Sequence, residues 1–192
     1  FKALEPTIRA IKNANPSIKV ILGGAGFSMF AEKIMERIPQ IDFGVYLEGE
    51  ESTPELLENL NKPETVKGVF IRKGDRVKFT GHRPLPNMKR LPVPDRHLID
   101  VKNYEHPVYT NIGIQTKRGC PLRCAYCNYP SLNGRQVRAR SAGQVADEIE
   151  QLINQYNIRR FMFVDSVFNV PNRHAEDICT EIVKRRLDVE WS

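Results

Sequence analysis

The chain has 192 residues, 41% of them hydrophobic, and a formal net charge of +6. This length suits one large or two small packed domains, and the sequence has neither an apolar run of about 18 residues that would cross a membrane nor a signal peptide. Four cysteines, three of them close together, disfavour a secreted disulfide framework and favour a thiolate metal site in a reducing compartment, so we expect a cytoplasmic protein.

The first part of the chain alternates strands and helices. Apolar runs and turn residues predict the end of a helix at 7–13, a strand at 18–22, a helix at 28–37 with Ser28 as its N-cap, a strand at 43–47 and a helix at 54–61. A β-hairpin with strands 66–72 and 76–80 is expected to follow. This alternation is typical of an α/β fold with a parallel sheet.

A proline-rich segment separates the two halves. Residues 83–96 contain four prolines and show little periodicity, which is typical of an extended linker. We therefore predict a first domain at 1–82, a linker at 83–103 and a second domain at 104–192.

The second half repeats the α/β pattern. A strand is predicted at 111–116, and Ser141-x-x-Gln144 is a capping box that starts a helix. That helix has one apolar face, formed by Val145, Ile149, Leu152, Ile153 and Tyr156. A strand at 160–164 ends at Asp165, and Pro171 is placed in the first turn of the next helix. Its apolar stripe comprises Ala175, Ile178, Cys179, Ile182 and Val183, so Cys179 is expected in the core.

The most informative motif is Cys120-x-x-x-Cys124-x-x-Cys127, directly after the strand at 111–116. Three soft ligands without a fourth suit an iron–sulfur cube with one open iron, whereas a fully ligated cluster takes four cysteines. The alternatives are a zinc site completed by His106 or His174, and cysteines that only pack. Both this loop and the segment Asp165-Ser166 follow strands, at the carboxyl ends where α/β proteins bind ligands.

The net charge is concentrated around the cysteines. Residues 106–146 contain six Lys and Arg residues and no Asp or Glu. Such a local basic field suits an anionic cluster or a carboxylate ligand. The alternatives are a solvated face and a nucleic-acid surface, and the few interleaved aromatic residues disfavour nucleic acid.

The cysteine motif, with Tyr126 before its last cysteine, resembles that of the radical S-adenosylmethionine (SAM) superfamily. The resemblance implies that Cys120, Cys124 and Cys127 hold a 4Fe–4S cluster, whose open iron is chelated by the amino and carboxylate groups of SAM. It implies that the reduced cluster cleaves SAM to methionine and a 5′-deoxyadenosyl radical, and that Tyr126 lies against the adenine. The alternative for Tyr126 is packing beneath the loop.

Two further segments resemble the cobalamin-binding branch of this superfamily. Asp165-Ser166 stands where most members place a Gly-Gly-Glu-like segment that meets the SAM amino group, and a carboxylate suits that ammonium. The alternative is that Asp165 caps the next helix. In the segment 134–141, the resemblance implies that Arg138 or Arg140 neutralises the SAM carboxylate, because arginine offers a bidentate fork. The alternative is a basic surface.

The first half resembles the closing part of a cobalamin-binding Rossmann-like domain, in residues 20–26 and 46–52. Gly23 and Gly24 allow a ligand to approach the backbone, and the following helix N-terminus favours a phosphate. The resemblance implies that this glycine pair lies beside the nucleotide tail of cobalamin. The order of these segments, followed by the proline linker and the cysteine loop, carries more weight than the glycines alone.

These observations together predict an α/β chain: the C-terminal part of a Rossmann-like cobalamin-binding domain, followed by the first β/α units of a partial TIM-type radical SAM barrel. Because the sequence starts at Phe1 and stops in a strand-like segment at 189–192, we expect a fragment of a longer protein. The resemblance implies a barrel of which only two β/α units and the start of a third are present, so we expect the isolated fragment to be inactive. The expected parent is a radical SAM enzyme that uses a 4Fe–4S cluster, SAM and cobalamin.

We expect this enzyme to perform methyl transfer or oxidative cyclisation or rearrangement on a small or lipid-like substrate. A reducing partner such as flavodoxin or ferredoxin is expected to supply electrons. The alternative enzyme is a methylthiotransferase acting on tRNA or protein. The alternative of another class is a zinc-stabilised binding module with a basic patch.

Overall fold

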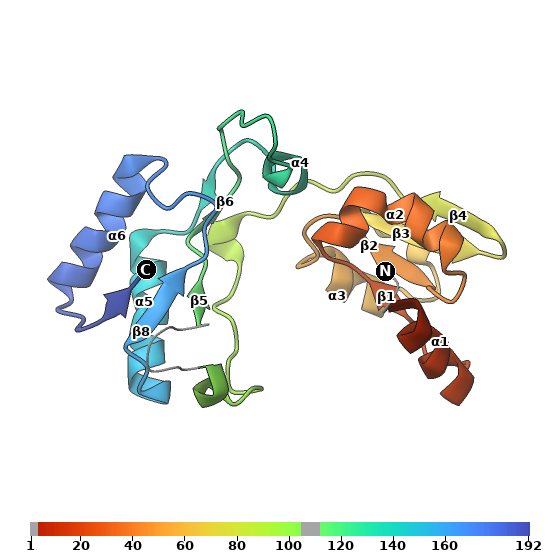
Figure 1. Ribbon diagram of the computed structural model, residues 1–192, viewed down its shortest axis with the longest axis horizontal. Coiled ribbons are helices and arrows are strands. Elements are labelled where there is room, and N and C mark those ends of the chain that lie inside the picture. The colour runs from red at the N-terminus through yellow and green to blue at the C-terminus, as the bar shows by residue number, and fades with distance from the viewer. Residues whose placement is uncertain (1–3, 105–111) are drawn as a thin grey trace. The chain divides into compact units, whose positions relative to one another are not determined.

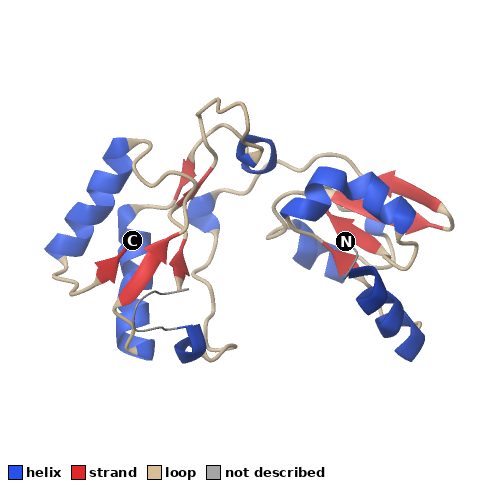
Figure 2. Ribbon diagram, in the orientation of Figure 1, coloured by secondary structure: helices blue, strands red, loops and turns tan. Residues whose placement is uncertain are grey.

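The computed structural model describes residues 4–104 and 112–192. His106, a candidate zinc ligand, and Asn111, the first residue of a predicted strand, lie outside the described residues. The chain divides into two compact units, Phe1–Pro86 and Asn87–Ser192 (Figures 1 and 2). The division falls inside the proline-rich segment, so part of that segment belongs to each unit.

The first unit is a mixed α/β layer structure. Its elements are α1 (Leu4–Ala14), β1 (Ile21–Leu22), α2 (Ala25–Arg37), β2 (Phe43–Val45), α3 (Ser52–Glu58), the 3-10 helix η1 (Pro63–Thr65), β3 (Val69–Lys73) and β4 (Arg76–Phe79). The strands form one sheet in the order β1-β2-β3-β4. Strands β1 and β2 are parallel, whereas β3 and β4 form the predicted antiparallel hairpin.

Apolar side chains fill both faces of this sheet because neighbouring residues of a strand point to opposite sides. Phe70 belongs to one cluster with residues of α1 and α2, among them Ile8 and Met35. Its neighbours Val69 and Ile71 belong to a second cluster with Leu56 of α3. The helices therefore cover both faces of the sheet.

Helix α2 begins earlier than the sequence predicts. Gly24 is its N-cap, and Ser28, the predicted cap, lies inside the helix and is buried. The Ser28 hydroxyl instead accepts a hydrogen bond of 2.9 Å from the backbone N–H of Leu47, just after β2. The prediction of Ser28 as N-cap is wrong, because the hydroxyl serves a tertiary contact rather than its own helix.

The second unit contains a parallel sheet and a separate two-stranded ladder. Its elements are η2 (Met88–Arg90), η3 (Val101–Tyr104), β5 (Gly113–Ile114), β6 (Lys117–Arg118), α4 (Tyr129–Asn133), β7 (Arg138–Ala139), α5 (Ala142–Tyr156), β8 (Arg160–Phe163), α6 (Asn172–Lys184) and β9 (Glu190–Trp191). The sheet has the order β5-β8-β9, and both of its pairings are parallel. The short strands β6 and β7 pair antiparallel beside it.

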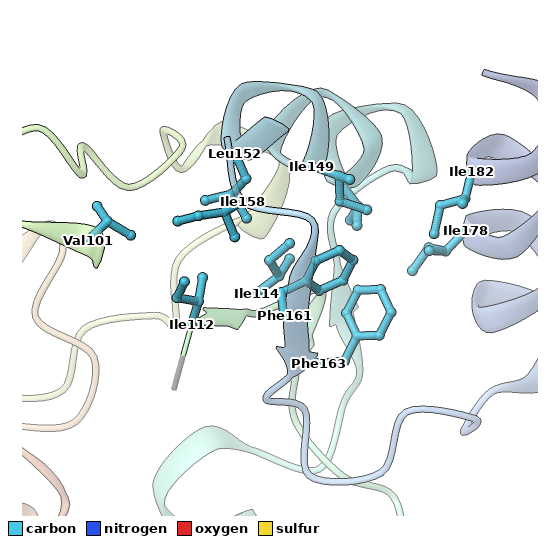
Figure 3. Packing of buried hydrophobic residues seen from close by; sticks show 11 residues of the cluster. Val101, Ile112, Ile114, Ile149, Leu152, Ile158, Phe161, Phe163, Ile178 and Ile182 are labelled. Atoms are coloured by element: carbon cyan, nitrogen blue, oxygen red, sulfur yellow. The ribbon is translucent and has the colours of Figure 1, made fainter. Parts of the chain in front are cut away.

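The core of the second unit lies between its sheet and the helices α5 and α6 (Figure 3). Ile114 and Phe161 from the strands lie among Ile149 of α5 and Ile178 of α6, all almost fully buried. The capping box of Ser141 and Gln144 is present, which confirms the predicted start of α5. Ala175, Ile178 and Ile182 of the predicted α6 stripe are buried, whereas Cys179 is only half-buried and Val183 is 75% exposed.

Residues 87–104 pack with the second unit. Met88 and Val101 are buried, and Val101 belongs to the same core cluster as Ile149. Within the two described ranges, no helix has the length and apolar character needed to traverse a bilayer.

Candidate functional site

The cysteine loop leaves the end of β6 and returns through β7 (Figure 1). The two strands pair Lys117 with Ala139 and Arg118 with Arg138, so they close the base of the loop. Inside it, the backbone N–H of Cys120 donates to the Gly134 carbonyl at 3.1 Å. The base of the loop is therefore fixed by backbone hydrogen bonds on both sides of the cysteine motif.

The three thiols differ in exposure. Cys120 is buried, whereas Cys124 and Cys127 are exposed and are joined by a backbone hydrogen bond of 3.2 Å from Cys127 N–H to the Cys124 carbonyl. Tyr126, between them, is 92% exposed. Among the described residues, no three His, Cys, Asp or Glu side chains are arranged so that they could hold a metal ion. The loop thus presents thiols without a preformed metal cage.

The donor set nevertheless fits the chemistry of an iron–sulfur cluster. Three thiols on one loop supply soft sulfur ligands, which iron–sulfur clusters require. His174, a candidate fourth ligand for zinc, lies on α6, where Nε2 contacts the Thr116 hydroxyl at 2.9 Å. Within the part of the chain that the structure describes, it therefore joins no cysteine group of the kind that a zinc site needs.

Asp165, at the end of β8, points back into the fold. Its side chain is fully buried and accepts hydrogen bonds from the backbone N–H groups of Thr116 and Lys117, at 2.8 and 3.1 Å. It also accepts from the Thr116 hydroxyl and, at 3.0 Å, from Lys117 Nζ. Asp165 does not cap the next helix, as the alternative supposed, because α6 has Pro171 at its N-cap and begins at Asn172.

Lys117 is a buried cation beside this carboxylate. Its side chain is only 2% exposed, and Nζ also donates to the Phe168 carbonyl at 2.8 Å while lying 5.5 Å from the centre of the Phe168 ring. Burial first, and then the Lys117 charge, hold the pKa of His174 below its ordinary value, although Asp165 and Asp177 oppose this. We call the side chains of Thr116, Lys117, Asp165 and His174 the Asp165 cluster.

The two candidate arginines have different surroundings. Arg140 is buried, and its guanidinium donates to Glu148, to the Gln115 carbonyl at 3.1 Å and to the Gln144 carbonyl at 3.0 Å. Arg138 is half-buried and donates to the Asn133 carbonyl at 3.0 Å, inside the cysteine loop. The guanidinium of Arg138 thus makes a contact inside the cysteine loop, whereas that of Arg140 is directed to Glu148 of α5.

Glu148 itself was missed by the sequence analysis. It is 1% exposed and also accepts a hydrogen bond from Arg96, which donates further to the Gly113 carbonyl at 3.1 Å. Glu148 lies among apolar residues on the predicted buried face of α5, and a carboxylate in such a position requires a cation. The position of Glu148 on an apolar helix face could have been recognised in the sequence, but the sequence does not show that Arg96 and Arg140 are the cations that contact it.

Gly23 and Gly24 lie at the exposed end of β1, immediately before α2. Because β1 and β2 are parallel, the segment after β2 begins at the same edge of the sheet as this glycine pair. A cavity of about 480 Å³ in this unit is lined by α2 and by aromatic side chains that include Tyr46 and Phe79. Neither glycine lines that cavity.

Comparisons with known proteins agree on one group of relatives. No protein-family model matches the sequence. An uncharacterised methyltransferase of Pyrococcus horikoshii is 30% identical over 185 residues, which are 94% of this chain and 40% of that protein. The anaerobic magnesium-protoporphyrin IX monomethyl ester cyclase of Cereibacter sphaeroides is 30% identical over 200 residues, 97% of this chain and 32% of the cyclase. The chain therefore spans less than half the length of these relatives.

Solved structures extend the similarity to the fold. The radical SAM methyltransferase TsrM of Kitasatospora setae, solved with cobalamin and a 4Fe–4S cluster bound, matches 95% of this chain with a TM-score of 0.75 and 26% identity. The match covers 37% of that protein. The similarity extends across both units and includes the cysteine loop, so the chain belongs to the cobalamin-binding type of the radical SAM superfamily.

Proposed function

We propose that this chain carries the cluster-binding and SAM-binding part of a cobalamin-dependent radical SAM enzyme. Cys120, Cys124 and Cys127 would hold a 4Fe–4S cluster. The observation that carries the proposal is the loop that presents two exposed thiols from a fixed base beside the carboxyl end of β5. When bound, such a cluster supplies the electron that cleaves SAM.

The side chains around the loop divide the recognition of SAM between them. Tyr126 is exposed and offers an aromatic face to adenine. Arg138 supplies a guanidinium fork for the SAM carboxylate, and exposed Ser166 follows β8 and offers a hydroxyl to the amino group. We assign the carboxylate role to Arg138 rather than to Arg140, because the buried guanidinium of Arg140 already donates to Glu148.

The first unit would supply the closing part of a cobalamin-binding Rossmann-like domain, and the second the opening β/α units of a TIM-type barrel. The parallel strands β5, β8 and β9 with helices α5 and α6 between them support the barrel assignment. Exposed Gly23 and Gly24 before α2 support contact with the nucleotide tail of cobalamin. In this proposal the domains are 1–82 and 104–192, joined by the proline-rich segment 83–103, whose residues from Asn87 onward belong to the second compact unit.

For the whole protein, we propose methyl transfer or oxidative cyclisation on a small or lipid-like substrate, with electrons from a small reducing protein. The proposal follows the methyltransferases and the cyclase among the relatives. Those relatives give no support to a methylthiotransferase.

Anaerobic reconstitution with iron and sulfide tests the cluster assignment. The chain should turn brown and bind about four iron atoms, the content of one 4Fe–4S cluster. Cys124→Ala should lose the colour and most of the iron. Cys179→Ala is the matched control, because this half-buried cysteine lies on α6 and should leave the iron content unchanged. A colourless chain with one equivalent of zinc would instead support the zinc-stabilised binding module.

Titration with hydroxocobalamin tests the first unit. The Cβ of Gly23→Ala would have ordinary van der Waals contact with Val45, so the fold should tolerate it. We expect weaker cobalamin binding by this variant with an unchanged thermal midpoint. Equal binding by the variant and the parent chain would refute the proposed role of the glycine pair.

A further inference from the structure

The Asp165 cluster joins the end of β8 to the chain that enters the cysteine loop. Thr116 and Lys117 stand between β5 and Cys120, and both of their backbone N–H groups donate to the same Asp165 oxygen, Oδ1. The second oxygen, Oδ2, accepts from the Thr116 hydroxyl and from Lys117 Nζ. One carboxylate thus fixes both the backbone and the side chains of these two residues.

These contacts use the hydrogen-bonding capacity of Asp165. A carboxylate has about four acceptor positions, and donors of Thr116 and Lys117 occupy four. The side chain has no exposed surface, and its charge is matched by a lysine that is itself 2% exposed. An ammonium ligand would have to displace a buried charge-assisted hydrogen bond to reach it, which is costly.

The same two residues set the start of the loop. Lys117 is the first residue of β6, and the Thr116 carbonyl accepts a hydrogen bond of 2.9 Å from the backbone N–H of Arg140, just after β7. Asp165 therefore holds the incoming chain, and the β6–β7 ladder ties that chain to the outgoing one. Cys120 follows three residues after Lys117, where its position depends on this anchor.

We propose that Asp165 is a positioning residue that holds the base of the cysteine loop through Thr116 and Lys117, and that it does not bind SAM. The inference rests on the proposed function insofar as the loop carries a cluster. It replaces the role that the sequence suggested for Asp165 and leaves the exposed neighbour Ser166 as the polar group available at this strand end.

Amide hydrogen exchange in the cluster-free chain tests the anchor without iron. Asp165→Asn keeps the shape of the side chain but leaves the Lys117 charge without its counter-ion. We expect exchange at Thr116, Lys117 and Cys120 to become at least about tenfold faster, because charge-assisted hydrogen bonds that protect this segment are lost. Amides in the middle of α5 should not change, and Asp177→Asn, an exposed carboxylate paired with Arg173, is the matched control. Unchanged exchange at Thr116 and Lys117 would overturn the inference.

Charge-neutral rescue separates anchoring from SAM binding. In Asp165→Asn/Lys117→Met, the amide oxygen can still accept from the two backbone N–H groups, and the buried charge is gone. We expect Asp165→Asn to lower iron loading several-fold and the double variant to restore most of it. The restored protein should bind SAM with the affinity of the parent chain, as measured by calorimetry. A double variant that recovers iron but not SAM affinity would assign Asp165 to SAM and overturn the inference.

An error in the proposed cluster assignment can be distinguished from an error in the proposed role of Asp165. If the parent chain takes up no iron, the cluster assignment is contradicted, and the exchange experiment still decides whether Asp165 anchors the loop.

Discussion

At the scale of single residues, Gly119 controls how the chain turns from β6 into Cys120. Its φ of +88° is in the region that side chains rarely adopt, and a Cβ here would overlap the backbone carbonyl of Gln136 on the returning segment. We expect Gly119→Ala to separate the two sides of the loop and to lower iron loading strongly in the reconstitution assay. The left-handed backbone alone costs about 1–2 kcal/mol, and the overlap adds to it.

Gly74→Ala is the control for this prediction. Gly74 also has a positive φ, +60°, but nothing lies within 4 Å of the added Cβ. This variant should lose stability through backbone strain and retain full iron loading. Equal iron loading by Gly119→Ala and the parent chain would show that the loop does not need this close approach.

His174 gives the second unit a pH dependence. The Thr116 hydroxyl donates its single hydrogen to Asp165, so the His174 Nε2–H donates to the hydroxyl oxygen. Burial and the Lys117 charge lower the pKa of His174 below 6.5, despite attraction from Asp165 and Asp177. The unfolded chain therefore takes up the proton first as the pH falls, so the contribution to stability is complete above 6.5 and is lost as the pH falls through the folded-state pKa.

Thermal unfolding measured between about pH 7.5 and pH 5 checks this sign. The midpoint of the parent chain should decrease over this range, and the decrease should be smaller in His174→Gln. His97→Gln is the matched control, since the His97 side chain is 70% exposed. A midpoint that rises on acidification would contradict the prediction.

For single residues, the sequence predicted the cysteine motif but not the tertiary partners of the charged side chains. The cysteine spacing marked the loop, because ligand spacing within a few residues is local information. The partners of Asp165 and Arg140 depend on tertiary contacts, so a carboxylate aimed at a ligand and one aimed at Lys117 look the same in the sequence. Both residues stand at sites predicted for ligands, yet their side chains are committed to the fold.

At the scale of elements, one buried carboxylate connects four segments of the second unit. Glu148 of α5 faces Arg96 from the proline-rich segment and Arg140 after β7, and these arginines donate to carbonyls of Gly113 in β5 and Gln115 beyond it. Removing the carboxylate leaves two buried guanidinium groups without their counter-ion. We expect Glu148→Ala to reduce the free energy of unfolding by about 3–5 kcal/mol in urea titrations.

Glu150→Ala provides the comparison on the same helix. Its carboxylate is 40% exposed and pairs with Arg185 at 3.3 Å, so its loss should cost less than about 1 kcal/mol. If Glu148→Ala and Glu150→Ala lower the free energy of unfolding equally, burial of the Glu148 ion pairs adds nothing to stability.

Local signals determined how well each element was predicted. The capping box placed the start of α5 correctly, since both partners lie within four residues. The hairpin of β3 and β4 was also predicted, because its turn is local. In contrast, Ser28 was assigned to the wrong role because its acceptor oxygen meets Leu47, nineteen positions later. Short strands such as β1 and β5 depend on their parallel partners, which the sequence does not name.

At the scale of the whole molecule, each unit has its own hydrophobic core. Met35 belongs to the core of the first unit and Leu152 to that of the second, and both are fully buried. The cysteine loop, the Asp165 cluster and Glu148 all belong to the second unit. Because the proposed cluster ligands depend on that unit alone, damage to the two cores should affect iron binding differently.

Met35→Ala and Leu152→Ala test this division. Each removes a large buried side chain and should destabilise its own unit by about 2–5 kcal/mol. We expect iron loading to fall in Leu152→Ala and to stay at the parent level in Met35→Ala, when both are reconstituted at the same temperature. Hydrogen exchange should show faster opening of α5 in the first variant and of α2 in the second. If Met35→Ala loses as much iron as Leu152→Ala, the cluster site requires both units, and the assignment of iron binding to residues 87–192 is wrong.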